Sequence, residues 1–186
     1  MRTFIAVDLA PEIKAALEAL IGKVRKNAGG ITWVKPDAMH LTLKFLGELP
    51  EDRVGSVKAV LVSLAGARRP FPMRLKGTGT FPPGGGMRAR ILWAGIEESP
   101  ELMELQAALE SELEKAGLPR EDRAFHPHLT LGRIKSPQGL EPVLRELERY
   151  READLGGMTV ARFTFFESVL GPSGPEHKVL AEAGLE

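Results

Sequence analysis

The tetrapeptide His-Leu-Thr-Leu occurs twice in this chain, within HLTLKFLGE at residues 40–48 and within HLTLGRI at residues 128–134. Apolar and polar residues alternate in both copies, which is typical of a half-buried β-strand. Because side chains alternate between the faces of a strand, His40 and Thr42 are expected on one face and the leucines on the other. His128 and Thr130 follow the same rule. The two copies therefore predict two strands that each bury two leucines and present an imidazole and a hydroxyl.

The elements around the two motifs follow one order. Strands are predicted at 2–9, 40–46 and 71–80 with helices at 11–24 and 51–64, and then strands at 88–96, 128–134 and 158–170 with helices at 101–116 and 139–151. The second set repeats the first at an offset of 88 residues, the separation of His40 and His128. A fixed offset indicates an internal repeat. We therefore predict an α+β fold, a single domain over residues 1–186 whose two pseudo-symmetric, interleaved lobes (about 1–80 and 88–170) place antiparallel sheet and outer helices around a central cleft.

Composition excludes several classes of protein. The chain has 186 residues, and 25 Lys and Arg balance 25 Asp and Glu, so it lacks the broad positive field of a non-specific nucleic-acid coat. It has no cysteine, which excludes disulfides, thiolate metal sites and a cysteine nucleophile. The first ten residues are too short and too charged for a signal peptide, and no stretch is long and apolar enough for a membrane span. We therefore expect a cytoplasmic protein without membrane contact.

Two His-x-Thr motifs facing one cleft suit the opening of a cyclic phosphodiester. This reaction needs a base for the attacking water, an acid for the departing alkoxide and donors for the non-bridging oxygens. Histidine can be neutral in one copy and protonated in the other near neutral pH. Thr42 and Thr130 can donate to the phosphoryl oxygens. The motifs therefore predict acid–base catalysis by His40 and His128 with no metal and no cofactor.

The sequence resembles the 2H phosphoesterases, specifically the RNA 2′,3′-cyclic phosphodiesterases also called 2′-5′ RNA ligases (LigT-like). The resemblance extends over nearly the whole chain, through RTFIAV at 2–7, WV at 33–34, HLTLKFLGE at 40–48 and FHPHLTLGR at 125–133. It implies the two-lobed 2H phosphoesterase fold and metal-free hydrolysis of RNA 2′,3′-cyclic phosphate ends, including those of tRNA-like fragments, to 2′-phosphates. It further implies that His40 is the proton donor, that His128 is the proton acceptor and that Arg133 lies near the phosphate. We expect the protein to act as a monomer.

Four neighbours of the motifs carry further expectations. Strict alternation places Arg133 on the leucine face, so a phosphate contact requires a twist or bulge near the strand end. The same alternation places Lys44 in phase with His40 and Thr42. Phe4 and Phe45 are expected to pack in the core, because large aromatic side chains are usually buried.

Three alternatives stay open. His126 and His128 form a His-x-His pair that, with His40 or His177 and a carboxylate, would suit a zinc phosphoesterase. The chain can also be a non-catalytic protein that binds RNA ends. Finally, the same acid and base can run the reverse reaction, joining a cyclic phosphate to a 5′-hydroxyl in a 2′-5′ linkage. Sensitivity to a chelator separates the zinc enzyme from the two-histidine enzyme.

Overall fold

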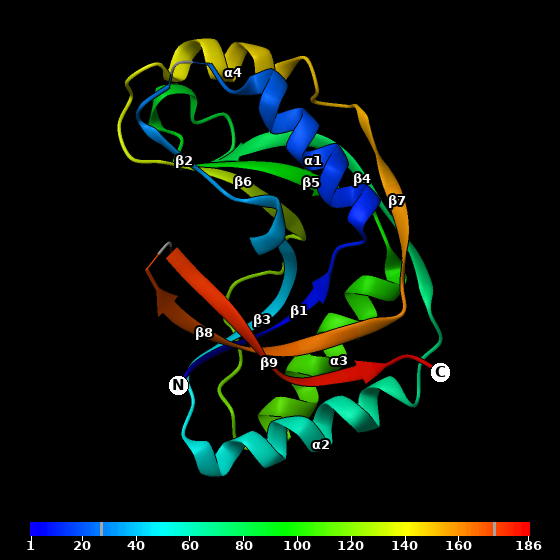
Figure 1. Ribbon diagram of the computed structural model, residues 1–186. Coiled ribbons are helices and arrows are strands. Elements are labelled where there is room, and N and C mark those ends of the chain that lie inside the picture. The colour runs from blue at the N-terminus through cyan, green and yellow to red at the C-terminus, as the bar shows by residue number, and fades with distance from the viewer. Residues whose placement is uncertain (27, 173) are drawn as a thin grey trace.

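The computed structural model describes residues 1–26, 28–172 and 174–186, which form two antiparallel sheets with helices on their outer sides (Figure 1). The first sheet has the strand order β3-β1-β8-β9, with β1 at Arg2–Asp8, β3 at His40–Glu48, β8 at Arg162–Gly171 and β9 at Gly174–Gly184. The second has the order β2-β6-β5-β4-β7, with β2 at Ile31–Trp33, β4 at Phe71–Phe81, β5 at Ile91–Ile96, β6 at His128–Ile134 and β7 at Asp154–Val160. The predicted α+β class and antiparallel sheets are confirmed.

The last strand of each half crosses to the sheet of the other half. β4 follows the first motif in sequence but lies beside β5 in the second sheet, whereas β8 follows the second motif and pairs with β1 in the first sheet. The three strands of each group are therefore ordered β3-β1-β8 and β6-β5-β4. Each motif strand is held in a sheet that the other half completes.

The helices also pack with elements from the other half of the sequence. They are α1 at Pro11–Val24, α2 at Val54–Ala65, α3 at Pro100–Lys115 and α4 at Leu140–Glu148. Helix α1 contacts α4 and β7, while α3 contacts α2 and β3. In Figure 1, α1 and α4 accordingly lie over the second sheet, and α2 and α3 lie with the first. Each layer thus contains elements from both halves of the sequence.

Local sequence explains where these helices begin and which face they bury. Pro11 begins α1, where its fixed φ is helical and its missing N–H has no partner to lose. Ser99 caps α3, and its hydroxyl oxygen accepts a hydrogen bond from the Leu102 amide at 3.3 Å. Each helix buries one apolar face: Ile13, Leu17, Leu20, Ile21 and Val24 in α1, and Leu102, Leu105, Leu109 and Leu113 in α3.

The C-terminal region differs from the prediction. The expected strand at 158–170 is two strands, β7 and β8, because the chain leaves the second sheet at Ala161 and enters the first. The apolar pattern continues across this point although the partner strand changes from β4 to β1. Strand β9 has no counterpart in the prediction, since only Ala183 among its residues is buried and its apolar and polar residues do not alternate regularly.

Three other boundaries also shift. The strand expected from Arg88 begins at Ile91, because Gly86–Arg88 form a 3-10 turn. A 3-10 turn at Glu51–Arg53 likewise precedes α2, and α4 ends at Glu148 rather than at residue 151. No helix in the described part of the chain is long and apolar enough to span a membrane.

Candidate active site

Two equivalent β-bulges determine which side chains of the motif strands turn inward. In β3 the register passes from Thr42 opposite Ala6 to Lys44 opposite Ile5, so Leu43 is an extra residue. In β6 it passes from Thr130 opposite Trp93 to Gly132 opposite Leu92, so Leu131 is extra in the same way. A bulge interrupts the alternation of side chains along a strand. The residues that follow each bulge therefore change faces relative to a regular strand.

In β3 the bulge reverses two expectations. Lys44 is 4% exposed and so is buried beside Leu43; the prediction that it shares a face with His40 was wrong. Phe45 is 63% exposed, so its predicted core role was also wrong. Phe45 pairs with Phe4 and Thr42 pairs with Ala6, which places Phe45 on the face of Thr42. We use the term inner faces for two surfaces: the face of the first sheet that carries His40 and Thr42, and the face of the second sheet that carries His128 and Thr130.

In β6 the bulge provides what Arg133 requires. Arg133 pairs with Ile91 and Thr130 pairs with Trp93, two residues further along β5, so Arg133 and Thr130 share the inner face. Gly132, which pairs with Leu92 between these two positions, is buried, whereas the Arg133 side chain is exposed. The bulge expected for this residue is therefore present. Arg133 and Phe45 occupy equivalent positions, 88 residues apart.

The two motif strands approach each other although they belong to different sheets. β3 and β6 are in contact, and each presents its histidine and threonine on an inner face. His40, Thr42, His128 and Thr130 are all half-buried, whereas Leu41, Leu43, Leu129 and Leu131 are buried in the main core. The predicted division of each motif between core and inner face is confirmed.

Aromatic rings form the surroundings of His40. Its ring stacks on Phe4 at a centroid distance of 4.7 Å and an interplanar angle of 24°. Phe4 in turn stacks on Phe166 at 5.2 Å, and these two with Ala6 form a buried cluster separate from the main core. Phe4 is therefore buried as predicted, but under the imidazole rather than in the main core.

The pKa of His40 is lowered from 6.5 to about 4. Burial is the largest cause, because it removes the water that solvates the charged ring, and the charge of His177 is the second. Lys14 lowers the pKa further, whereas a hydrogen bond with the backbone of Ala38 acts in the opposite direction. In the free protein the imidazole of His40 is therefore uncharged near pH 7.

His128 is held by a hydrogen bond to the chain that leads into its strand. Its Nδ1 lies 2.7 Å from the carbonyl oxygen of His126. Because a carbonyl only accepts, Nδ1 carries the proton and Nε2 of the neutral ring keeps a lone pair. Phe81 contacts the ring edge-on at 4.9 Å. The backbone partners Ala38 and His126 each precede their histidine by two residues, so both imidazoles are oriented from equivalent positions.

A hollow of about 450 Å³ lies beside this part of the second sheet. Trp93, Thr80 and Pro83 contribute to its lining, and Trp93 packs against Phe81 at 5.6 Å. The indole Nε1 of Trp93 is buried, with no hydrogen-bond partner within the described ranges. The hollow therefore adjoins the aromatic rings next to His128 rather than the histidine itself.

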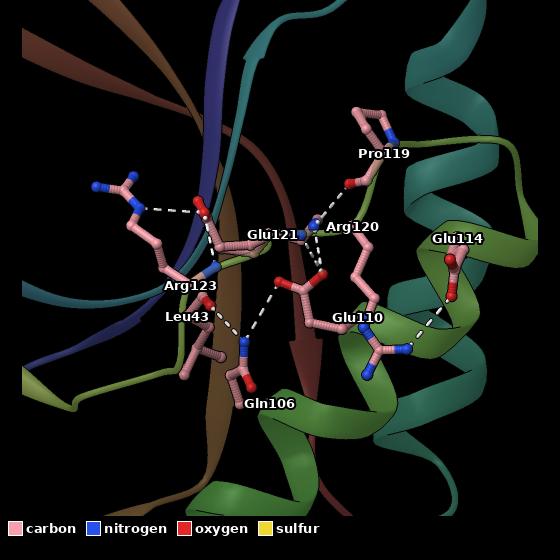
Figure 2. A network of polar contacts seen from close by, with 9 residues as sticks. Leu43, Gln106, Glu110, Glu114, Pro119, Arg120, Glu121 and Arg123 are labelled. Carbon is pink, nitrogen blue, oxygen red and sulfur yellow. Dashed lines mark hydrogen bonds and ion pairs between the residues drawn. The ribbon is translucent and has the colours of Figure 1, made fainter.

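A buried polar network ties β3 to the segment that precedes the second motif (Figure 2). Lys44 Nζ donates to Glu110 Oε2 at 2.5 Å and to the carbonyl oxygen of Pro119 at 3.0 Å. Glu110 Oε2 also accepts from the amide of Glu121, and Gln106 donates to Glu110 Oε1 and to the Leu43 carbonyl. Both partners of the ion pair are almost fully buried. The network thus fixes the bulged residue of the first motif and the approach to the second at one point.

One nearby histidine entered the sequence predictions only as a metal ligand. His177, on β9, lies edge-on to His40 with ring centroids 4.8 Å apart. Sequence alone had no means to place it there, because its strand was not predicted. Across residues 1–26, 28–172 and 174–186, no three His, Asp or Glu side chains gather in an arrangement that can hold a metal ion.

Comparison with known proteins identifies the family of this chain. A model of the 2′-5′ RNA ligase superfamily matches residues 4–171. The RNA 2′,3′-cyclic phosphodiesterase of Thermotoga maritima is 36% identical over 189 residues, covering 100% of this chain and 96% of that protein. The protein of the same name from Thermus thermophilus is 39% identical over 191 residues, covering 100% and 90%.

Solved structures show the same architecture. A crystal structure of a Thermus thermophilus protein superposes with a TM-score of 0.84 at 35% identity and covers 100% of this chain and 98% of that one. E. coli LigT in complex with 3′-AMP gives a TM-score of 0.79 at 26% identity, covering 99% and 97%. The family match extends over most of the chain and includes both His-Leu-Thr-Leu copies. The chain therefore belongs to the 2′-5′ RNA ligase superfamily.

Proposed function

We propose that this protein hydrolyses RNA 2′,3′-cyclic phosphate ends to 2′-phosphate ends by acid–base catalysis between His40 and His128. The observation that carries the proposal is the pair of half-buried histidines on contacting strands, each oriented by the backbone two residues before it. The names of the Thermotoga and Thermus relatives support the same substrate.

In the proposed reaction His128 accepts a proton from water through Nε2, and the water oxygen forms a bond to phosphorus. The bond from phosphorus to O3′ breaks, and the departing O3′ takes a proton from His40. Thr42 and Thr130 donate hydrogen bonds to the non-bridging oxygens, and Arg133 supplies a positive charge whose effect is strongest on the transition state. No metal or cofactor takes part.

The environment of His40 adds a condition to this order of roles. A ring with a pKa of about 4 is neutral near pH 7, so it must gain a proton before it can act as donor. An anionic phosphodiester beside the imidazole favours the charged form and raises its pKa. Substrate binding therefore prepares the acid, while His128 already has the tautomer that a base requires.

The reverse reaction uses the same groups. When a 5′-hydroxyl of RNA replaces water, attack on the cyclic phosphate produces a 2′-5′ linkage by the same proton transfers. The superfamily name supports this activity as a second direction of the same site. We propose that the protein acts on these ends as a monomer.

The test uses an oligoribonucleotide with a 2′,3′-cyclic phosphate end, incubated with the protein in excess EDTA. Phosphorus NMR of the product distinguishes a 2′-phosphate from a 3′-phosphate. A 2′-phosphate formed in EDTA is the expected result, and a second arm with a 5′-hydroxyl acceptor reports ligation. Activity that returns only with added Zn²⁺ would instead establish the zinc alternative, and binding without turnover would establish an RNA-end-binding protein.

The double variant His40→Ala/His128→Ala is the matched control for contaminating nuclease. Any hydrolysis that it retains does not come from the two motifs.

A further inference from the structure

The C-terminal hairpin brings a third histidine to the site. β9 lies three strands from β3 in the order β3-β1-β8-β9, and His177 pairs with Ser168 of β8. Yet the ring centroids of His177 and His40 are only 4.8 Å apart. The inner face of the first sheet is therefore concave, and the side chains of its two outer strands converge over Phe4.

The geometry of this contact is specific. His177 is nearly perpendicular to His40, at 77°, and to the Phe4 ring below it, at 78° with centroids 5.0 Å apart. Phe166 lies 6.1 Å away. The His40 imidazole thus stacks on the Phe4 ring and is in edge-on contact with the His177 imidazole. The rings of His40 and His177 therefore have little freedom to rotate.

Few charges surround the two rings. Burial lowers the pKa of His177, and Asp8 of β1, which pairs with His40 in the register, acts in the opposite direction by favouring the protonated ring. Asp8 is itself held by a hydrogen bond from the Thr164 hydroxyl at 3.2 Å. Lys14 of α1 is the other charged group that acts on His40. The neighbours Phe4 of β1 and Phe166 of β8 carry no charge, so among the residues that the structure describes His177 is the titratable ring in contact with His40.

We propose that His177 is a positioning residue for His40: it fixes the plane of the His40 ring and, when protonated beside Asp8, opposes a second proton on His40. The role rests on the proposed function of His40. Two imidazoles at this distance do not readily carry charge together, since like charges in a half-buried site repel strongly. The two rings therefore titrate as a coupled pair in which a proton on His177 opposes a proton on His40, and the anionic substrate supplies the charge that lets His40 take a proton.

Proton NMR titration of the four histidine rings tests this directly, without reference to activity. In the unmodified protein the His40 signal, assigned by its loss in His40→Gln, should titrate near pH 4. In His177→Gln, which is polar but uncharged, the pKa of His40 should rise but stay below 6.5, because burial is unchanged. Asp8→Asn lowers the proton affinity of His177 and should also raise the pKa of His40.

His126→Gln is the matched control, because it removes an exposed histidine and should leave the titration of His40 unchanged. An unchanged pKa of His40 in both His177→Gln and Asp8→Asn would overturn the proposal. His177→Phe separates packing from charge, since it retains an aromatic ring.

Kinetics provide the second readout. The acid limb of kcat/KM should move to higher pH in His177→Gln, whereas a purely structural role would lower the rate at every pH without moving the limb. If the unmodified protein opens no cyclic phosphate at all, the proposed function fails while the NMR result still decides the coupling of the two rings.

Discussion

Arg133 and Phe45 occupy equivalent places after equivalent bulges, so one half of the molecule presents a guanidinium where the other presents a phenyl ring. Phe45 also lies 6.1 Å from Phe4, the ring on which His40 stacks. The inner faces are therefore unlike at their rims although their motifs are identical. This asymmetry suits a substrate that has an anionic phosphate and an apolar base.

Replacing these two residues should separate phosphate binding from base binding. Arg133→Ala should lower kcat/KM by about 10²-fold, because it removes a charged donor whose effect is strongest on the transition state. Phe45→Ala should raise KM by about 10-fold, the order expected for losing one stacked base, with kcat little changed. Steady-state kinetics on cyclic-phosphate dinucleotides that differ in base provide the measurement. A rise in KM for Phe45→Ala that is just as large on an abasic substrate would contradict the division.

Loss of either motif histidine should affect the rate far more than folding. His40→Ala and His128→Ala should each lower kcat by roughly 10² to 10⁴, the range for removing a general acid or base. Thr42→Val and Thr130→Val should cost less, since proton transfer is retained and only a donor to phosphate is lost. Single-turnover rates, with circular dichroism to verify the fold, measure these effects. A His128→Ala variant with near-normal turnover would exclude the proposed base.

The buried state of His40 predicts that stability falls in mild acid. The pKa of His40 is 6.5 when unfolded and about 4 when folded, so between these values the unfolded chain binds more protons. Its contribution is complete above pH 6.5 and is lost as pH falls to about 4, by about 3 kcal/mol in all. Urea unfolding at about pH 7.5 and about pH 4.5, on either side of most of this window, should show a smaller loss in His40→Gln than in the unmodified protein. Equal losses in the two proteins would show that His40 is solvated in the fold.

Removing one partner of the buried Lys44–Glu110 pair should lower the free energy of unfolding far more than replacing both partners with apolar residues. Lys44→Met leaves Glu110 buried without its partner, which should lower the free energy of unfolding by about 3 to 5 kcal/mol. The double variant Lys44→Met/Glu110→Leu removes both charges and should recover most of that stability. Thermal unfolding of the three proteins checks this double-mutant comparison. If the double variant is stable but slow, the network also positions the segment before the second motif.

The sequence predicted the fold class, most element boundaries and the four inner-facing residues, because these follow from local periodicity. Two-residue alternation held from His40 to Leu43 and from His128 to Leu131. It failed at Lys44 and Phe45, since a bulge arises from pairing with a neighbouring strand and leaves no mark in a single strand's pattern. The requirement for a bulge before Arg133 was visible only because its expected role conflicted with its phase.

His177 could not be predicted for a different reason. Its strand is mostly exposed and follows no clear alternation, and its proximity to His40 depends on the curvature of a four-stranded sheet. Contacts of this kind join residues 137 positions apart and depend on how strands coil together rather than on either segment alone. The pKa of His40 is lowered chiefly by burial and secondly by that contact, so it too could not be predicted from the sequence.

The exchange of β4 and β8 between the sheets has a consequence for any attempt to divide the chain. A fragment that ends before β5 would leave one edge of β1 unpaired and β4 without a sheet to join, so neither half can form its own motif site. The two halves exchange strands as domain-swapped protomers do: the first half contributes β4 to the second sheet, and the second half contributes β8 to the first sheet. Separating the two halves therefore requires breaking the hydrogen bonds between strands of the same sheet, not only the contacts between two surfaces. The relative placement of the two histidines consequently persists for as long as both sheets stay intact.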